Sequence, residues 1–220
     1  MNDDIRQSDR TYYIETMHID DIPEVSRVER RCFTNPWPES AYRRELRNPE
    51  NNHYVVLRHR ERVAPRSGPV TEPRGRLSLL PLLRKSERQM ADPIVGFCGM
   101  WILYDESHVT TIGVAPEYRG EGLGELLLLS LFEEALARNC QWLTLEVRVS
   151  NVTAQALYQK YGFTKHGVRR RYYSDNGEDA DIMWSASLRD PDYLRQIDGL
   201  RDSLLARFRE QNVEIETRDP

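Results

Sequence analysis

The stretch from Ile112 to Leu129, written IGVAPEYRGEGLGELLLL, joins a β-like run to a leucine-rich helix through a glycine-rich turn. Glycines at 120, 122 and 124 let the backbone direct its N–H groups inward, and the following helix adds the positive end of its dipole. Such a turn is suited to a phosphate group. Its G-x-G-x-G register does not match the dinucleotide fingerprint G-x-G-x-x-G, and the GK[ST] ending of a nucleoside-triphosphate loop is absent. The stretch therefore predicts a phosphate-binding turn of another kind.

Outward from this turn, strand and helix patterns follow one another in a mixed order. Strands are predicted at residues 11–17, 53–58, 94–104, 108–115, 141–149, 163–173 and 180–187, and helices at about 20–32, 40–47, 121–137, 152–161 and 190–211. The order is that of an α+β fold, because strands and helices do not alternate strictly as in a doubly wound sheet. The last helix is expected to lie beyond the natural end of the sheet.

Residues 60–93 have a different composition from the rest of the chain. They are rich in proline and contain one apolar run, LSLLPLL at 77–83, which is predicted to dock back onto the body. This segment predicts a long insertion within a single domain. From Arg58 to Arg88 there are nine Lys or Arg residues against three Asp or Glu. The excess of positive charge is typical of a segment that contacts RNA or an acidic partner, and equally of a solvated loop.

The composition restricts the class of protein. Of the 220 residues, 39% are hydrophobic and 30% are charged, which indicates a soluble globular protein. No apolar run reaches the length of a membrane span, and the start, MNDDIRQSDR, does not resemble a signal peptide. Cys32, Cys98 and Cys140 are far apart and lack CxxC spacing. We therefore expect a cytoplasmic protein with reduced thiols, no metal site and no membrane contact.

Five segments together resemble the GNAT superfamily of N-acetyltransferases, and within it the RimI branch, the ribosomal-protein-alanine N-acetyltransferases. In order they are NPWPES (35–40), IGVAPEYRGEGLG (112–124), LEVRVSN (145–151), ALYQKYGF (156–163) and RRRYYSDNGEDADIM (169–183). The resemblance implies the GNAT fold, a mixed and mostly antiparallel sheet of six to seven strands flanked by about four helices. It assigns residues 11–188 to the N-acetyltransferase domain, with the insertion at 60–93, and residues 189–220 to a C-terminal helical extension.

The resemblance also implies a site for acetyl-CoA as co-substrate, without a metal. The residues expected to bind it, through the fourth strand, the turn and the end of the fifth strand, are Ile112, Gly113, Val114, Arg119, Gly120, Glu121, Gly122, Leu123, Gly124, Glu125 and Asn151. Glu146 matches the proposed general base, and Tyr158 matches the proposed general acid beside the CoA sulfur. Trp37, Tyr172 and Tyr173 would line the peptide groove.

Acetyl transfer from a thioester to an amine requires the same residue types. An N-terminal ammonium must lose a proton before it attacks a thioester, and a carboxylate can accept that proton. The departing thiolate needs a proton or hydrogen bond, which a tyrosine can supply, and the oxyanion needs a donor such as a backbone N–H near Val114. Each residue also has a structural interpretation. Glu146 could be an exposed strand carboxylate that pairs with Arg148 or its neighbours, and Tyr158 could be a core or surface aromatic of an amphipathic helix. Asn151 could cap the following helix, and the three groove aromatics, Trp37, Tyr172 and Tyr173, could simply pack.

The sequence thus predicts an acetyl-CoA-dependent N-terminal protein acetyltransferase, a monomer acting on the N-terminal alanine of a small-subunit ribosomal protein. A GNAT enzyme that acetylates a small amine or a lysine side chain is one alternative, and a non-catalytic CoA- or partner-binding module is another. The insertion and the helical tail depart from the family pattern. Both are expected to leave the cofactor site alone, and the basic insertion is expected to suit a ribosomal or RNA surface.

Overall fold

One mixed sheet of eight strands organises the part of the chain that the computed structural model describes, residues 10–60 and 92–216. The strand order is β6-β7-β5-β4-β3-β2-β1-β8. Neighbours are antiparallel except for two parallel pairs, β4 with β5 and β1 with β8. The strands are β1 (Arg10–Thr16), β2 (Asn52–Arg60), β3 (Ile94–Leu103), β4 (Glu106–Val114), β5 (Trp142–Arg148), β6 (Thr164–Arg169), β7 (Ala180–Trp184) and β8 (Val213–Glu216).

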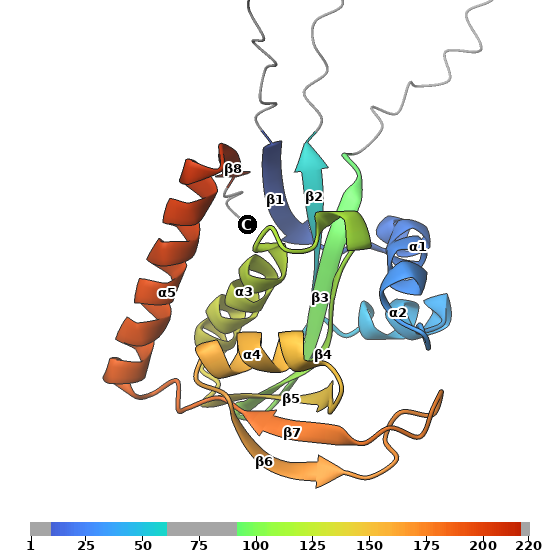
Figure 1. The fold of residues 1–220 in the computed structure, drawn as a ribbon. Coiled ribbons are helices and arrows are strands. Elements are labelled where there is room, and N and C mark those ends of the chain that lie inside the picture. The colour runs from blue at the N-terminus through green and yellow to red at the C-terminus, as the bar shows by residue number, and fades with distance from the viewer. Residues whose placement is uncertain (1–9, 61–91, 217–220) are drawn as a thin grey trace, which may run out of the picture.

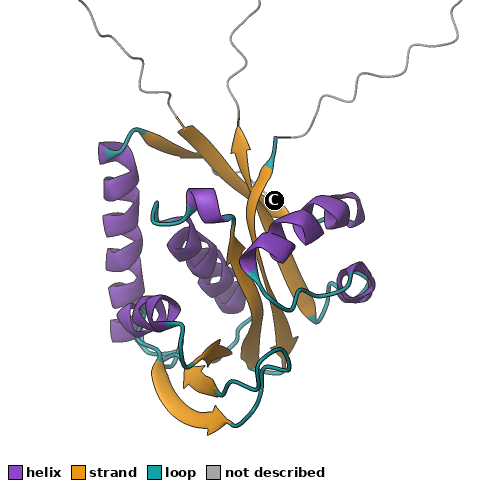
Figure 2. Cartoon of the chain, turned by 45° about the vertical axis from the view of Figure 1, so that its right-hand side comes forward, coloured by secondary structure: helices purple, strands orange, loops and turns teal. Residues whose placement is uncertain are grey.

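Helices cover both faces of this sheet (Figures 1 and 2). On one face lie α1 (Ile22–Cys32), preceded by the 3-10 turn η1 (Ile19–Asp21), and α2 (Glu39–Glu45). On the other lie α3 (Leu123–Ala137), α4 (Val152–Lys160) and α5 (Pro191–Glu210), with a second 3-10 turn, η2 (Pro116–Tyr118), between β4 and α3. The α+β class is confirmed, and the five α-helices of the described residues are the expected four and the additional C-terminal helix.

The spacing of apolar residues explains why these elements form. In α1, Ile22, Val25 and Val28 are buried on one face, and Pro23 lies in the first turn, where it costs no intrahelical hydrogen bond. In contrast, β3 is apolar almost throughout, IVGFCGMWIL, because it lies mid-sheet with helices on both of its faces.

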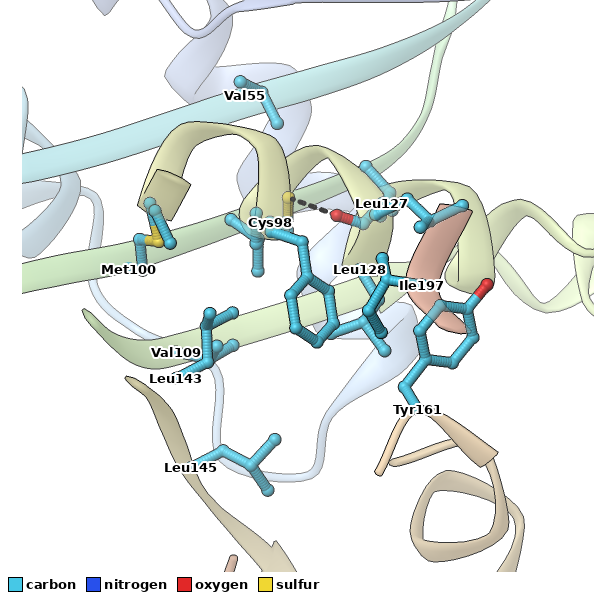
Figure 3. Close-up of a cluster of buried hydrophobic side chains, with 14 of the residues drawn as sticks. Val55, Cys98, Met100, Val109, Leu127, Leu128, Leu143, Leu145, Tyr161 and Ile197 are labelled. Atoms are coloured by element: carbon cyan, nitrogen blue, oxygen red, sulfur yellow. Dashed lines mark hydrogen bonds between the residues drawn. The ribbon is translucent and has the colours of Figure 1, made fainter. Parts of the chain in front are cut away.

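The helix α3 is apolar on nearly all sides, which is typical of a helix that is covered all round. The sheet covers one side and α5 covers another, with Tyr193, Ile197 and Leu204 of α5 in the same buried cluster as the α3 leucines. Figure 3 shows this core around Leu127 and Leu128 of α3, with side chains from several strands.

The expectation of six to seven strands is wrong, because the tail continues past α5 into an eighth strand. β8 pairs in parallel with β1, from Arg10 with Val213 to Tyr13 with Glu216. Arg60 of β2 pairs with Glu216 at 2.5 Å and so reaches across β1. The tail helix therefore does not lie beyond the end of the sheet. Four residues, VEIE, are too few to give a readable alternation in the sequence.

Most of the expected insertion, including the LSLLPLL run, lies outside the described residues. Its two ends, Arg60 and Asp92, lie close together, since Arg60 Nε is 3.5 Å from a carboxylate oxygen of Asp92. Within residues 10–60 and 92–216, no helix has both the length and the apolar character that crossing a membrane requires.

Candidate active site

The parallel strands β4 and β5 separate partway along their length. In the described chain their paired residues run only from Glu106 with Trp142 to Val109 with Leu145. β4 continues to Val114 on its other neighbour, β3, and β5 continues to Arg148 on β7. One side of β4 from Thr110 onward therefore presents backbone N–H and C=O groups that β5 does not engage. Such groups are suited to an extended ligand that hydrogen-bonds along the strand.

A change in register marks the point of separation. Met100 pairs with Val109 and Gly99 pairs with Thr111, so Thr110 is an additional residue on β4. The Thr110 hydroxyl donates to the carbonyl of Gly99 at 3.1 Å, which holds this bulge in place. Bulges bend a strand and redirect its side chains, and they are common next to active sites.

The glycine-rich turn has the backbone that its sequence predicts. Gly120 has φ of 82° and Gly122 has φ of 92°, both in the left-handed region that L side chains rarely adopt. Gly122 is the N-cap residue of α3, and no side chain of the described residues caps this end of the helix. The first-turn N–H groups of α3 are therefore free of a side-chain acceptor, as an anion site at a helix N-terminus requires.

Two charged side chains of the turn, Arg119 and Glu121, are engaged elsewhere than at these amides. Arg119 is bent back so that its Nε donates to the carbonyl of Val114 at 3.0 Å. Glu121 pairs with Arg10 at 2.5 Å and accepts a hydrogen bond from Tyr12 at 3.1 Å. Arg119 and Glu121, both predicted to bind the cofactor, thus lie in the turn. The side chain of Glu121 is used by Arg10 and Tyr12, so only the backbone of Glu121 is available to a ligand in the turn. Neutralising this carboxylate reduces its repulsion of a bound phosphate.

Glu125, in the first turn of α3, is buried in a network of its own. Its side chain is 7% exposed, and it pairs with Lys160 of α4 and with Arg207 of α5, the latter at 2.8 Å. The hydroxyl of Tyr161 also donates to it at 2.8 Å. Burial acts to raise the pKa of Glu125, but these three donors outweigh it and hold the pKa below its ordinary value. The carboxylate therefore ties α3, α4 and α5 together.

The C-terminal helix reaches this turn, so the expectation that the tail leaves the cofactor site alone is wrong. A Cβ atom on Gly122 would lie 2.7 Å from Nη2 of Arg207 and 3.0 Å from Cδ1 of Leu204. The α5 helix thus packs directly against the backbone of the turn. Helical spacing in the sequence shows which residues of α5 share a face, but it does not show what that face will contact.

Glu146 lies on β5, in the part of the strand that has left β4. Its side chain is 5% exposed. One oxygen is 2.9 Å from Nε2 of His108 on β4, and the other is 2.9 Å from Nε of Arg169 on β6. Burial acts to raise the pKa of Glu146, but the hydrogen bond and charge of His108, followed by the charge of Arg169, lower it below its ordinary value. Glu146 is therefore a carboxylate held ionised between two basic side chains.

The expected alternative, a pair between Glu146 and Arg148, is not what forms. Arg148 pairs instead with Asp175 at 2.8 Å and with Glu178 at 3.0 Å.

The two ring nitrogens of His108 face different groups. The Thr144 hydroxyl donates to the Glu106 carboxylate at 2.7 Å, so toward His108 it can only accept. Nδ1 of His108, 2.9 Å from that hydroxyl, must then donate to it. Nε2 faces the carboxylate of Glu146, which also accepts. The two ring nitrogens thus face the Thr144 hydroxyl and the Glu146 carboxylate.

Tyr158 lies on α4, next to Phe163 with ring centroids 5.7 Å apart. Burial raises the pKa of its hydroxyl, and the nearby Tyr173 hydroxyl adds to the effect. Burial likewise raises the pKa of Tyr173 to about 12, with a smaller contribution from Glu146. Tyr173 therefore lies within electrostatic reach of both predicted catalytic residues. A tyrosine kept protonated in this way can act as a proton donor.

Asn151 caps a helix, which was the structural alternative for this residue. It is the N-cap residue of α4, and its Oδ1 accepts from the N–H of Ala154 at 3.1 Å. A contact between Asn151 and CoA stays a prediction.

The predicted groove aromatics occupy two loops that meet. Trp37, in the loop after α1, packs on Tyr42 with centroids 5.6 Å apart. Tyr172 and Tyr173, after β6, contact each other edge to face at 5.1 Å. The two loops are joined by a hydrogen bond from Thr34 to Asp175 and by one from Asn35 to Ser174 at 3.0 Å. Residues about 140 positions apart in the chain thus form a bridge.

Sequence reasoning did not anticipate His108, Arg169 or Arg207 as parts of the site. The alternation on β4 places Glu106 and His108 on one face, which is a usable signal. Their partners on β5 depend on a cross-strand register that the sequence does not reveal. Among the described residues, no group of three or more His, Cys, Asp or Glu side chains could hold a metal ion.

Comparison with known proteins agrees with the geometry. A family model described as the acetyltransferase (GNAT) family matches residues 71–163. A protein of Bacillus subtilis (strain 168), named as a candidate ribosomal protein bS18-alanine N-acetyltransferase, is 37% identical over 171 residues, which are 78% of this chain and 93% of that protein. The N-alpha-acetyltransferase RimI of Mycobacterium tuberculosis (strain ATCC 25618 / H37Rv) is 34% identical over 169 residues, which are 74% of this chain and 85% of that protein.

Solved structures give the same result. The crystal structure of the ribosomal-protein-S18-alanine N-acetyltransferase from Escherichia coli has a TM-score of 0.60 at 27% identity, and the match covers 79% of this chain and 92% of that one. The expected fold and the resemblance from which the site residues were taken are both confirmed.

Proposed function

Because the chain belongs to the GNAT family of acetyltransferases, we propose that it transfers an acetyl group from acetyl-CoA directly to the α-amino group of a protein N-terminus. Two of the relatives above are named for the N-terminal alanine of ribosomal protein bS18 or S18, and we extend that substrate to this chain. The observation that carries the proposal is the ionised Glu146, buried on β5 where that strand has left β4.

The backbone of β4 and of the turn is the proposed seat of acetyl-CoA. The N–H groups of residues 120–124 and the N-terminus of α3 would receive the pyrophosphate, and Ile112 to Val114 would hydrogen-bond the pantetheine arm. The residues fit this group, because two left-handed glycines open the turn and the carboxylate of Glu121 is neutralised outside it. Bound in this way, acetyl-CoA supplies the activated acetyl group.

Glu146 is proposed to attract the substrate's ammonium and to receive its proton. An α-amino group has a pKa of about 7.7–8.0, well above that of a carboxylate whose pKa is already lowered. Complete proton transfer before attack is therefore uphill. The attack therefore comes from the small equilibrium fraction of neutral amine, whose first proton has gone to Glu146 or to solvent. As the C–N bond forms, the nitrogen becomes far more acidic, and a weak base such as a carboxylate suffices to accept the second proton. The buried negative charge of Glu146 holds the amine in position until that moment.

Tyr158 is proposed to protonate the leaving thiolate. Its raised pKa keeps the hydroxyl protonated at neutral pH, so that a proton is available when the C–S bond breaks. Direct transfer of this kind needs no acetyl-enzyme.

The loop after β6 supports a protein N-terminus as the substrate. It is tied to the loop after α1 by the bonds from Thr34 to Asp175 and from Asn35 to Ser174. The flanking tyrosines, Tyr172 and Tyr173, provide apolar faces for the first residues of a peptide.

A panel of substrates tests the proposal. CoA release would be measured with peptides that differ only in the first residue, with an N-terminally blocked peptide containing lysine, and with a polyamine. We expect turnover on the free N-terminal alanine and none on the blocked peptide. Acetylation of the lysine or polyamine alone would refute the proposal, and acetyl-CoA binding without any turnover would indicate a binding module.

We also propose that the basic segment around residues 60–93 contacts the ribosome, and that the enzyme is a cytoplasmic monomer. The charge excess between Arg58 and Arg88 supports the first part. Deleting residues 62–90 should reduce co-sedimentation with ribosomes while peptide turnover persists. Unchanged co-sedimentation would refute the contact, and size-exclusion chromatography would test the monomer.

A further inference from the structure

Each oxygen of the Glu146 carboxylate has a basic partner before any substrate arrives. His108 occupies one oxygen and Arg169 occupies the other, each at 2.9 Å. A buried carboxylate without a partner would be costly, so both contacts stabilise it in the free enzyme. A substrate ammonium that approaches Glu146 must therefore replace one of these two groups or crowd against them.

The two partners of Glu146 differ in how firmly they are held. The His108 side chain is 18% exposed, and its other nitrogen is fixed by Thr144. The Arg169 side chain is 55% exposed and extends from β6, the outermost strand at that edge of the sheet. Apart from Glu146, it lies near the ring of Tyr172, with 5.6 Å from Cζ to the ring centroid. Arg169 is therefore the partner that can leave, because its guanidinium can be hydrated as soon as it swings outward.

We propose that Arg169 is a placeholder for the substrate's N-terminal ammonium. In the free enzyme its guanidinium neutralises Glu146, and on binding the ammonium takes that position while Arg169 moves into solvent. The inference rests on the proposed function, and it explains why the enzyme would select a charged N-terminus over an uncharged one. A charged amine exchanges one cation for another, whereas an uncharged or blocked N-terminus would leave the buried carboxylate with His108 alone.

The fold does not depend on this ion pair, so removing it is a usable test. β6 is held to β7 by its own ladder, from Thr164 with Trp184 to Arg169 with Ala180. Lys165 of β6 also pairs with Asp181 of β7 at 2.5 Å. We therefore expect an Arg169→Gln variant to fold normally.

The experiment compares two peptides of the same sequence, one beginning with alanine and the other with a propionyl group that lacks the amine. Dissociation constants would be measured by calorimetry for the wild type, Arg169→Gln, Arg169→Lys and the control Arg170→Gln, which removes the same charge from the neighbouring exposed position. In Arg169→Gln we expect the amine peptide to bind about threefold to tenfold more tightly, with the propionyl peptide changed less than about twofold. Arg169→Lys and Arg170→Gln should resemble the wild type.

Two outcomes would overturn the exchange. One is unchanged or weaker binding of the amine peptide to Arg169→Gln, which would make Arg169 a substrate contact or a structural tie. The other is an equal change for both peptides, which a general effect on the loop would produce. Turnover by the wild type is measured first. If it acetylates only another amine, the proposed function fails, and the exchange is then tested with that amine and its uncharged analogue.

Discussion

Replacing the glycines of the turn one at a time by alanine separates what the backbone requires from what α5 requires. At Gly120, φ is 82°, and within the described residues no atom beyond its two chain neighbours lies within 4 Å of an added Cβ. At Gly122, φ is 92° and the Cβ would lie 2.7 Å from Arg207 Nη2, 3.0 Å from Leu204 Cδ1 and 3.3 Å from a ring carbon of Phe208. The two positions thus share the backbone strain, but only Gly122 adds crowding.

The expected losses of stability follow from these contacts. Alanine in a left-handed conformation costs roughly 1–2 kcal/mol, which is the whole expected effect at Gly120. Overpacking adds about 1–3 kcal/mol at Gly122, where Leu204 must move and Arg207 must loosen its pair with Glu125. Gly124 is a helical residue whose Cβ would meet only Val114 Cγ2 at 3.9 Å. Gly124→Ala should therefore be neutral or stabilising by up to about 1 kcal/mol.

Urea denaturation of the three variants measures this order directly. Acetyl-CoA affinity, measured by calorimetry, provides a second readout. Gly124→Ala should keep its stability but bind acetyl-CoA more weakly if the turn receives the pyrophosphate. As a control, Gly122→Ala should cost less in an Arg207→Ala background than in the wild type, because the closest atom is then gone. Equal losses for Gly120→Ala and Gly122→Ala would refute the reasoning that α5 packs against the turn.

Three further variants test the site. Glu146→Gln should lower turnover by about a hundredfold or more while acetyl-CoA affinity stays within about twofold, and full activity would exclude Glu146 as base. Tyr158→Phe should slow CoA release without loosening acetyl-CoA, and an unchanged rate would exclude it as the acid. The folded-state pKa of Glu125 is depressed below 4.5, so its pairs with Lys160 and Arg207 stabilise the protein above that pH and are lost as the pH falls through the folded value. The gap in unfolding free energy between wild type and Glu125→Gln should therefore shrink below about pH 4.5, and a constant gap in urea titrations would contradict this assignment.

Elements with strong local signals could be predicted from the sequence. The glycine-rich turn was predicted from its glycines, and Gly120 and Gly122 adopt left-handed conformations that few other residues adopt. The strand predicted at 94–104 and the leucine-rich helix predicted at 121–137 are present as β3 and α3. The short strand β8 escaped detection because its pairing with β1 joins residues about 200 positions apart, and nothing local in VEIE requires it.

Only some residues of the site could be predicted from the sequence. Glu146 and Tyr158 were identified because they fall in motifs of a known family. His108 and Arg169 were not, because their role depends on β4, β5 and β6 bringing three side chains into one row across the sheet. Such a row follows from strand order and register, which the periodicity of a single strand does not determine.

The pairing of β8 with β1 sets a condition on the order of synthesis. β1 is synthesised about 200 residues before its parallel neighbour, which is complete only when residue 216 has been added. Until then, β1 has β2 on one side and an open edge on the other, and α3 lacks its outer cover. A nascent chain can therefore assemble most of its sheet early. The contact of α5 with the glycine turn can form only after α5 has been synthesised, so a chain arrested before α5 should be readily cut by protease near residues 119–125.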